Sequence, residues 1–247
     1  MRALRILLIL VVILGGLFVI VDRVAVHFAE GEAADKLKAS QNLASTPDVN
    51  IKGFPFLTQV AGGSLDDVEV GIKDYEAATG TAGKTIRIDD LKADMKGVSF
   101  SGDYSSATAA TATGTATISY GELLKTAKSE PTEVLPGLTA KVVALSDGGN
   151  GKIKVTAKVT GRLGPLPIDQ TVSVPSTVSV VNNRVQVHAD SLPKLGAATI
   201  AENRVRRITD FQQAIDRLPG GIELDKVQAA KDGVQITVKG SDVKLAG

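Results

Sequence analysis

The alternation of apolar and polar residues over most of the chain is the feature that most limits its fold. From Leu65 onwards, apolar side chains recur at every second position, as in "DVEVGI" at 67–72 and "KIKVTAKV" at 152–159. Such alternation places apolar side chains on one face of a strand and polar side chains on the other, which is typical of antiparallel sheets with one buried face. The sequence therefore predicts a chain built mainly of half-buried antiparallel strands.

Three stretches rich in glycine or asparagine separate these segments. They are "SDGGNGK" at 146–152, "VNNR" at 181–184 and "KDGV" at 231–234. Each predicts a hairpin, because glycine and asparagine accept the backbone angles of tight turns. Segments 135–158 and 218–240 also resemble each other, which indicates either an internal repeat of two similar modules or two hairpins with similar sequence requirements.

Two short helices are predicted between the strands. "SYGELLKTA" begins with Ser119 and Glu122 at the spacing of a capping box, and "TDFQQAIDRLPGG" begins with Thr209 and Gln212 at the same spacing. In the second segment, four apolar residues share one helical face, and the Pro-Gly-Gly after them ends the helix. These apolar residues are Ile208, Phe211, Ile215 and Leu218.

One predicted strand, "ATAATATGTATIS" at 107–119, carries unusually small side chains on one face. This face contributes little apolar bulk to a close-packed core. It indicates either an edge strand or the close approach of a helix; alternatively, the small side chains leave space for another occupant. The residues of this face are Ala110, Ala112, Gly114, Ala116 and Ile118.

The N-terminus predicts a membrane segment. Arg2 and Arg5 precede an uncharged apolar run over residues 6–21, and Asp22 and Arg23 come directly after it. Sixteen residues lie between the length of a signal-peptide core and the roughly 20 residues that span a bilayer. Because positive charges remain on the cytoplasmic side, the rest of the chain is expected outside the cytoplasm.

Cleavage of this segment would depend on the residues after the apolar run. Small residues after the run offer loose cleavage sites. However, no helix breaker separates the apolar run from the helix-compatible stretch that follows it up to residue 45. Pro47 is expected to end this helix. We therefore expect a signal anchor, or a signal peptide, over residues 1–22 and one extracytoplasmic domain over residues 23–247. The small residues are Ala25, Ala29 and Ala33.

Composition removes several classes of function. The chain has no cysteine, which excludes disulfides, thiolate catalysis and zinc–cysteine sites. Beyond residue 21, 26 basic residues (28 less Arg2 and Arg5) face 27 acidic residues, so the basic excess that nucleic-acid binding needs is missing. G-x-S-x-G and H-E-x-x-H motifs are absent. We expect no enzymatic activity, cofactor, metal or nucleic-acid partner.

Two acidic groups are the remaining catalytic candidates. Paired carboxylates serve hydrolysis or calcium binding, but neither group has the spacing of an EF-hand loop. We interpret both as solvated turns, with a hydrolase as the less favoured alternative. The groups are Asp66, Asp67 and Glu69, and Asp89, Asp90 and Asp94.

A basic cluster, Arg204, Arg206 and Arg207, precedes the second predicted helix. Arginine forks suit phosphate groups, and the helix N-terminus would add donors. The cluster therefore indicates either a solvated face with local ion pairs or a site for anionic lipid headgroups.

Two segments carry a resemblance to a known family. "GFPFLTQVAGGSLDDVEVGI" at 53–72 resembles the G-F-P-F-L signature of the actinobacterial LmeA-like phospholipid-binding proteins, and "LPGGIELDKVQAAKDGVQITVKGSDVKL" at 218–245 resembles their C-terminal hairpin. The resemblance covers roughly residues 20–247. It implies an α+β fold like that of tubular lipid-binding proteins, in which a curved antiparallel sheet wraps a long helix around an apolar groove.

The resemblance also implies a function. It points to a non-catalytic envelope protein on the outer side of the cytoplasmic membrane that binds an anionic phospholipid, including phosphatidylinositol-type lipids. It implies support of lipoglycan assembly, with an envelope glycosyltransferase as a possible partner. A protein-interaction scaffold for envelope enzymes is the alternative, and it predicts an exposed apolar patch without an enclosed groove.

The same resemblance assigns candidate site residues. Phe54, Phe56 and Leu57 are expected at or near the mouth of the apolar groove, with Val60 and Phe211 as further lipid contacts. The alternative is that the phenylalanines plug one end of the core. In the lipid-binding interpretation, the three arginines of the basic cluster contact the headgroup.

Overall fold

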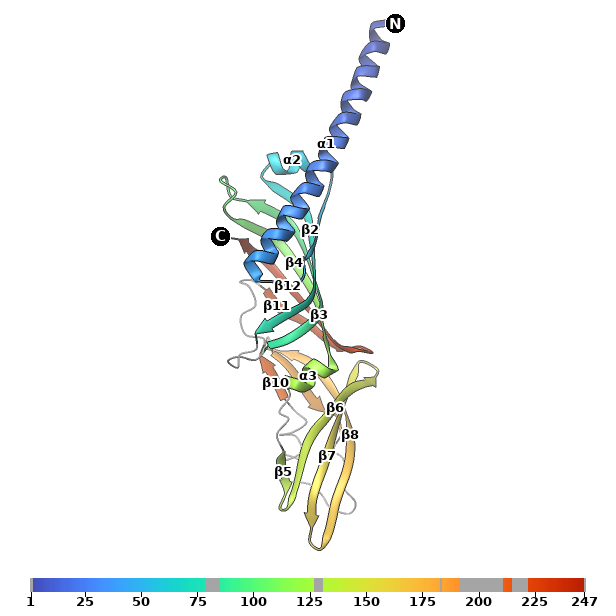
Figure 1. Cartoon of the computed structure of the whole chain (residues 1–247), viewed down its shortest axis with the longest axis vertical. Coiled ribbons are helices and arrows are strands. Elements are labelled where there is room, and N and C mark those ends of the chain that lie inside the picture. Colours follow the sequence, from blue (N-terminus) through green and yellow to red (C-terminus); the bar gives the residue numbers. More distant parts are fainter. Residues whose placement is uncertain are drawn as a thin grey trace.

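The computed structural model is an α+β protein with one long N-terminal helix and two curled antiparallel sheets (Figure 1). It describes residues 2–78, 85–126, 131–182, 184–191, 211–214 and 222–246 of the 247-residue chain. The molecule is elongated, with the first half of the helix at one end and the second sheet at the other. The predicted fold class is confirmed.

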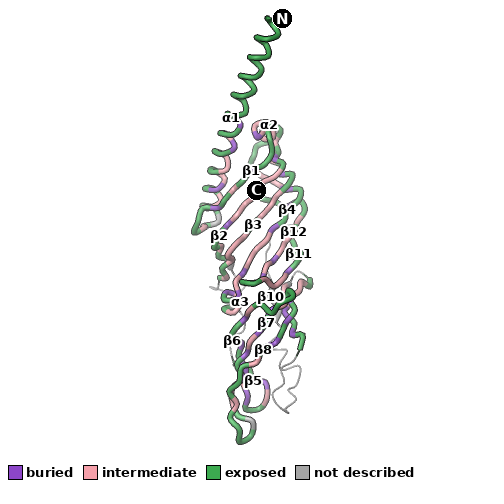
Figure 2. The backbone as a smooth tube through the Cα atoms, turned by 90° about the vertical axis from the view of Figure 1, so that its right-hand side faces the viewer, coloured by how far each residue is buried: buried purple, intermediate pink, exposed green. Residues whose placement is uncertain are grey.

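The helix α1 (Arg2–Gln41) has two parts with different surroundings. Its first half stands clear of the rest of the protein, and its second half lies against the first sheet (Figures 1 and 2). Residues 6–21 are exposed, whereas Val26 and Ala34 in the second half are buried. The helix is long and apolar enough to cross a membrane.

The end of α1 differs from the prediction. The helix ends at Gln41, six residues before Pro47. Asn42 adopts a left-handed conformation with φ +51°, and the N–H of Leu43 donates to the carbonyl oxygen of Lys38 at 3.0 Å. This is the bond of a Schellman motif, so Asn42 rather than Pro47 ends the helix.

The first sheet curls around the second half of α1. Its strand order is β1 (Asp48–Lys52), β2 (Ser64–Ala78), β3 (Thr85–Phe100), β4 (Ala107–Ser119), β12 (Gly233–Ala246) and β11 (Ile222–Ala229). The short helix α2 (Phe56–Ala61) connects β1 to β2, and α3 (Tyr120–Thr126) comes after β4 near the junction of the two sheets.

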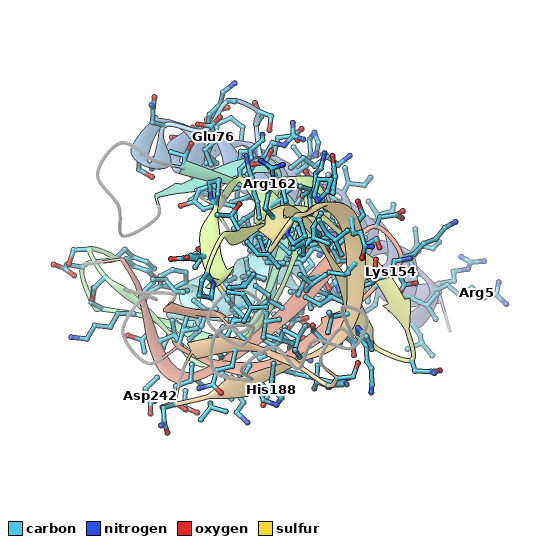
Figure 3. All side chains as sticks on the ribbon, turned by 90° about the horizontal axis from the view of Figure 1, so that it is seen from below. Arg5, Glu76, Lys154, Arg162, His188 and Asp242 are labelled. Carbon is cyan, nitrogen blue, oxygen red and sulfur yellow. The ribbon has the colours of Figure 1, made fainter. Side chains whose placement is uncertain are left out.

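The second sheet extends away from the end of the first sheet that carries α3. Its strand order is β10 (Phe211–Ala214), β9 (Arg184–Ala189), β8 (Leu166–Val181), β7 (Lys152–Leu163), β6 (Leu138–Gly149) and β5 (Thr132–Leu135). Both sheets carry exposed charged residues, among them the four labelled in Figure 3: Glu76, Lys154, Arg162 and Asp242.

The predicted hairpins are present. They connect β6 to β7, β8 to β9, and β11 to β12. Segments 135–158 and 218–240, which resemble each other in sequence, thus form hairpins in different sheets. That they arose as an internal repeat stays a prediction, as do the domain boundaries. The first predicted helix is present as α3, and its capping box is formed in one half. The Ser119 hydroxyl accepts the N–H of Glu122 at 3.4 Å, but the N–H of Ser119 donates to Oδ2 of Asp89 at 3.2 Å.

The second predicted helix is wrong where the structure describes it. Residues 211–214 form β10, which pairs antiparallel with β9 and places Phe211 opposite Val187. An apolar spacing over few residues does not separate helix from strand, and the open edge of β9 supplies backbone partners that a local pattern does not reveal. Ile208, Thr209, Ile215 and Leu218 lie outside the described residues.

Of the alternatives given for residues 107–119, the edge strand is wrong. β4 is a central strand between β3 and β12. A Cβ atom on Gly114 would lie 2.8 Å from Cγ2 of Val238 on β12, and Ala109 is fully buried beside Val98. Small side chains on β4 therefore make room for larger ones from neighbouring strands on the concave face of a curled sheet.

A bend crosses three strands of the first sheet. The register places Gly97 of β3, Ala110 of β4 and Asp242 of β12 opposite one another, and the strand pairing is interrupted at this row. Gly97 and Asp242 have φ angles of +60° and +52°. Such interruptions bend a strand and increase its twist, so the row contributes to the curvature that surrounds α1.

Candidate functional site: an apolar cavity between α1 and the first sheet

A cavity of about 380 Å³ lies between α1 and the concave face of the first sheet. Ala29 and Ala33 of α1, Phe56 and Val60 of α2, and residues of β1, β2, β3, β4 and β12 line it. Its lining consists of hydrocarbon side chains and Tyr104. The volume falls within the roughly 300–1,000 Å³ of small-molecule sites, so the cavity suits an apolar ligand.

The segment "GFPFLTQV" leads the chain from β1 into α2. Gly53 has φ +97°, and the peptide bond between Phe54 and Pro55 is cis. Phe56 is buried and lines the cavity, whereas Phe54 is 57% exposed. The two phenylalanines therefore have different surroundings: one belongs to the cavity wall and the other to the surface.

Asp22 holds α2 against α1. Its side chain has no exposed surface, and its Oδ1 accepts the N–H of Leu57, in the first turn of α2, at 2.8 Å. The residue before α2, Pro55, makes no side-chain cap, so a carboxylate from α1 satisfies a donor that the first turn leaves free. In the sequence, Asp22 is recognisable only as the residue after the apolar run, and its contact with α2, 35 residues away, is not predicted.

Arg23 connects Asp22 to the turn before α2. Its Nη2 lies 2.6 Å from Oδ2 of Asp22 and 3.4 Å from the carbonyl oxygen of Gly53. Its guanidinium also lies over the ring of Phe54, 5.3 Å from the centroid. The buried carboxylate is therefore paired with a cation that is itself stacked on an exposed aromatic ring.

A second carboxylate of α1 fixes the edge of the first sheet. Oε1 of Glu30 accepts the N–H of Ile51 on β1 at 2.8 Å. Ile51 lines the cavity, so Glu30 and Asp22 together attach α1 to two parts of the cavity wall.

The loop between β3 and β4 forms another part of the wall. The Tyr104 hydroxyl donates to the carbonyl oxygen of Val60 at 2.8 Å, and its ring lies 5.7 Å from that of Phe100. The carboxylate of Asp103 accepts the hydroxyls of Ser101 and Ser105 at 2.6 and 2.8 Å. These hydrogen bonds, with that of Ser101 as the largest cause, lower the pKa of Asp103 to about 2.

The predicted site residues lie in different parts of the molecule. Phe56 and Val60 line the cavity, Leu57 packs against the buried cluster beneath α1, and Phe54 lies outside the lining. Phe211 belongs to β10 in the second sheet, and its side chain is outside the described residues. The basic cluster also lies outside them: Arg204, Arg206 and Arg207.

The acidic candidates lie within strands, so their interpretation as turns is wrong. The described residues include one close group, in which carboxylate oxygens of Asp67, Glu69 and Asp94 lie within 4.8 Å of one another. Lys52 bonds to Glu69, and Nζ of Lys96 lies 3.9 Å from Asp94. Two cations thus offset much of the negative charge of this group. None of the three residues lines the cavity.

The comparison with protein families gave a match over most of the chain. The family model described as LmeA-like phospholipid-binding matches residues 20–239. The matched range includes the second half of α1, the second sheet and every residue of the cavity lining except Leu245. Comparisons with curated proteins and with solved structures gave no match.

Proposed function

Because the chain belongs to the LmeA-like phospholipid-binding family, we propose that the cavity beneath α1 holds an acyl chain of a membrane phospholipid. We further propose that the protein acts on the outer side of the cytoplasmic membrane, held there by α1, and supports envelope lipid or lipoglycan assembly without catalysing a reaction. An envelope glycosyltransferase is the proposed partner.

The apolar lining is the observation that carries the proposal. An acyl chain gains roughly 0.8 kcal/mol for each methylene that leaves water, and the lining offers it hydrocarbon side chains. The one polar group of the lining, the Tyr104 hydroxyl, is engaged with Val60. Among the described lining residues, no carboxylate, imidazole or aliphatic hydroxyl is present to act as an acid, a base or a nucleophile.

A variant that fills the cavity tests the proposal. Ala33 lines the cavity, whereas Ala39 lies on the exposed face of the same helix. We expect Ala33→Phe to reduce the phospholipid that copurifies with the full-length protein, as measured by native mass spectrometry, and Ala39→Phe to leave it unchanged. Wild-type protein that is folded but free of lipid would contradict the proposal and favour an interaction scaffold.

We propose that the headgroup is anionic and that Arg204, Arg206 and Arg207 contact its phosphate, because a guanidinium forks onto phosphate oxygens. Replacing all three by alanine should reduce the preference for vesicles containing phosphatidylinositol over vesicles of phosphatidylcholine alone. The loss should be largest at low ionic strength, since exposed ion pairs give only about 0.2 to 1 kcal/mol each and salt screens them. If the variant keeps the preference, the three arginines do not select the headgroup, and the interpretation as a solvated face with local ion pairs is favoured.

A further inference from the structure

We propose that the folded domain docks onto the membrane through the end from which α1 emerges, with the exposed side chains of Arg23, Val24, Phe28 and Phe54 in the interfacial layer of the outer leaflet. We call these four residues the docking surface. The inference rests on the proposed membrane anchoring by α1 and deepens it, since it assigns a bilayer contact to the domain itself.

The position of α2 is the first observation. In both views α2 lies beside α1 at the point where α1 leaves the first sheet (Figures 1 and 2). The turn before α2 carries Phe54, whose ring is stacked under Arg23. Aromatic rings and long cationic side chains are the groups that settle at membrane–water interfaces.

The length of the apolar run is the second observation. Residues 6–21 span about 24 Å as a helix, less than the roughly 30 Å of bilayer hydrocarbon. A short span draws its flanking residues towards the bilayer. Val24 and Phe28, which come after Val21 within about 10 Å of helix, are 65% and 74% exposed. The docking surface is therefore continuous with the membrane segment.

The contacts of Asp22 are the third observation. A free carboxylate next to hydrocarbon would be costly, but Asp22 is fully buried and bonded to Leu57 and Arg23. The same contacts attach α2 to the helix that enters the membrane. Because α2 has Phe56 and Val60 in the cavity wall, docking would place this wall beside the leaflet that supplies the lipid.

Single tryptophans test the docking, because the chain has none of its own. Phe54→Trp and Phe28→Trp report on the docking surface, and Val12→Trp reports on the membrane segment. Leu166→Trp is the exposed control, because Leu166 pairs with Leu163 at the turn between β7 and β8, the end of the second sheet that lies farthest from the free end of α1 (Figure 1). Each full-length variant is reconstituted in vesicles of phosphatidylcholine and phosphatidylglycerol with brominated acyl chains, which quench tryptophan at the bilayer.

We expect strong loss of emission for Val12→Trp, clear loss for Phe54→Trp and Phe28→Trp, and none for Leu166→Trp. Phe28→Trp keeps the test decisive if Phe54→Trp does not fold. Loss for Val12→Trp without loss at either docking position would overturn the inference and leave the anchoring in place. Unquenched emission from Val12→Trp would overturn the anchoring, and the docking with it.

Discussion

The turn into α2 depends on one glycine. Gly53 adopts φ +97°, which residues with a Cβ atom rarely occupy. A Cβ atom here would lie 2.5 Å from Nε2 of Gln59 and 3.1 Å from Oδ2 of Asp66. Oε1 of Gln59 accepts the N–H of Asp66 at 2.8 Å, so moving the amide away would disturb this bond.

We expect Gly53→Ala to lower the free energy of unfolding by about 1 to 3 kcal/mol. Gly31→Ala is the matched control, because Gly31 lies in α1 with open space around its missing side chain. This control should raise stability by about 0.5 to 1 kcal/mol. Denaturant titration of the full-length protein in detergent measures both, and a Gly53→Ala protein as stable as wild type would disprove this account of the turn.

The loop between β3 and β4, which carries Tyr104, should contribute less to the stability of the fold at acid pH. The pKa of Asp103 is lowered from 3.8 to about 2, mainly by the hydroxyls of Ser101 and Ser105. A carboxyl whose pKa is lower in the folded than in the unfolded protein stabilises the fold above its unfolded pKa. This contribution is therefore complete above about pH 4 and is lost as the pH falls to 2.

The comparison of wild type with Asp103→Asn tests this pH dependence. The difference between their melting temperatures should be largest near neutral pH and shrink as the pH approaches 2. Asp35→Asn, on the exposed face of α1, is the control and should differ little from wild type at any pH. If the difference in melting temperature between wild type and Asp103→Asn stays constant down to pH 2, the ionised carboxylate of Asp103 does not stabilise the loop.

At the scale of elements, α2 is a helix of six residues that depends on α1 for its position. So short a helix is marginal alone, and its N-terminal donor at Leu57 is satisfied by Asp22. Asp22 thereby links the end of the exposed apolar run to the cavity wall.

We expect Asp22→Ala to lower the melting temperature by about 2 to 8 °C, the effect of losing a helix cap in a chain of this size. Less lipid should also copurify, since α2 carries Phe56 and Val60. Glu32→Ala is the control, because Glu32 is an exposed acid of α1 that pairs with Lys36 across one helical turn. Equal melting temperatures for the two variants would mean that the cap does not stabilise α2.

Local patterns predicted the elements whose partners are close in sequence. The alternation of apolar and polar residues predicted the strands, and the turns at 146–152, 181–184 and 231–234 predicted three hairpins. These predictions succeed because the conformation of a strand or a tight turn depends on residues close to it in sequence. β10 and the central place of β4 depend on strands far away in sequence, and a local pattern does not contain them.

In the candidate site, too, residues with distant partners were not predicted from the sequence. The structure places Phe56 of "GFPF" in the cavity wall and Phe54 at the surface, and the role of both in lipid binding stays a prediction. Asp22, Glu30 and Tyr104 were missed because each acts on a backbone group 21 to 44 residues away. Their identities alone, a flanking acid, a helical acid and a loop tyrosine, do not indicate those partners.

At the scale of the whole molecule, charge and apolar surface are separated along the long axis. Arg5 projects from the free end of α1 (Figure 3), the exposed apolar run comes next, and the folded domain lies beyond it (Figure 1). Positive charges before such a run favour a cytoplasmic N-terminus. The cavity and the second sheet would then lie outside the cytoplasm.

The absence of cysteine allows this orientation to be measured in cells. Leu166→Cys places a thiol at the turn between β7 and β8 in the second sheet, and Leu4→Cys places one before the apolar run; both leucines are exposed. A membrane-impermeant maleimide should label Leu166→Cys in cells whose cytoplasmic membrane is intact and Leu4→Cys only after that membrane is permeabilised. Both proteins should remain in the membrane fraction at full length, because an uncleaved α1 retains its N-terminal residues. Labelling of Leu4→Cys from outside would reverse the orientation, and full-length protein in the soluble cytosolic fraction would exclude the anchor.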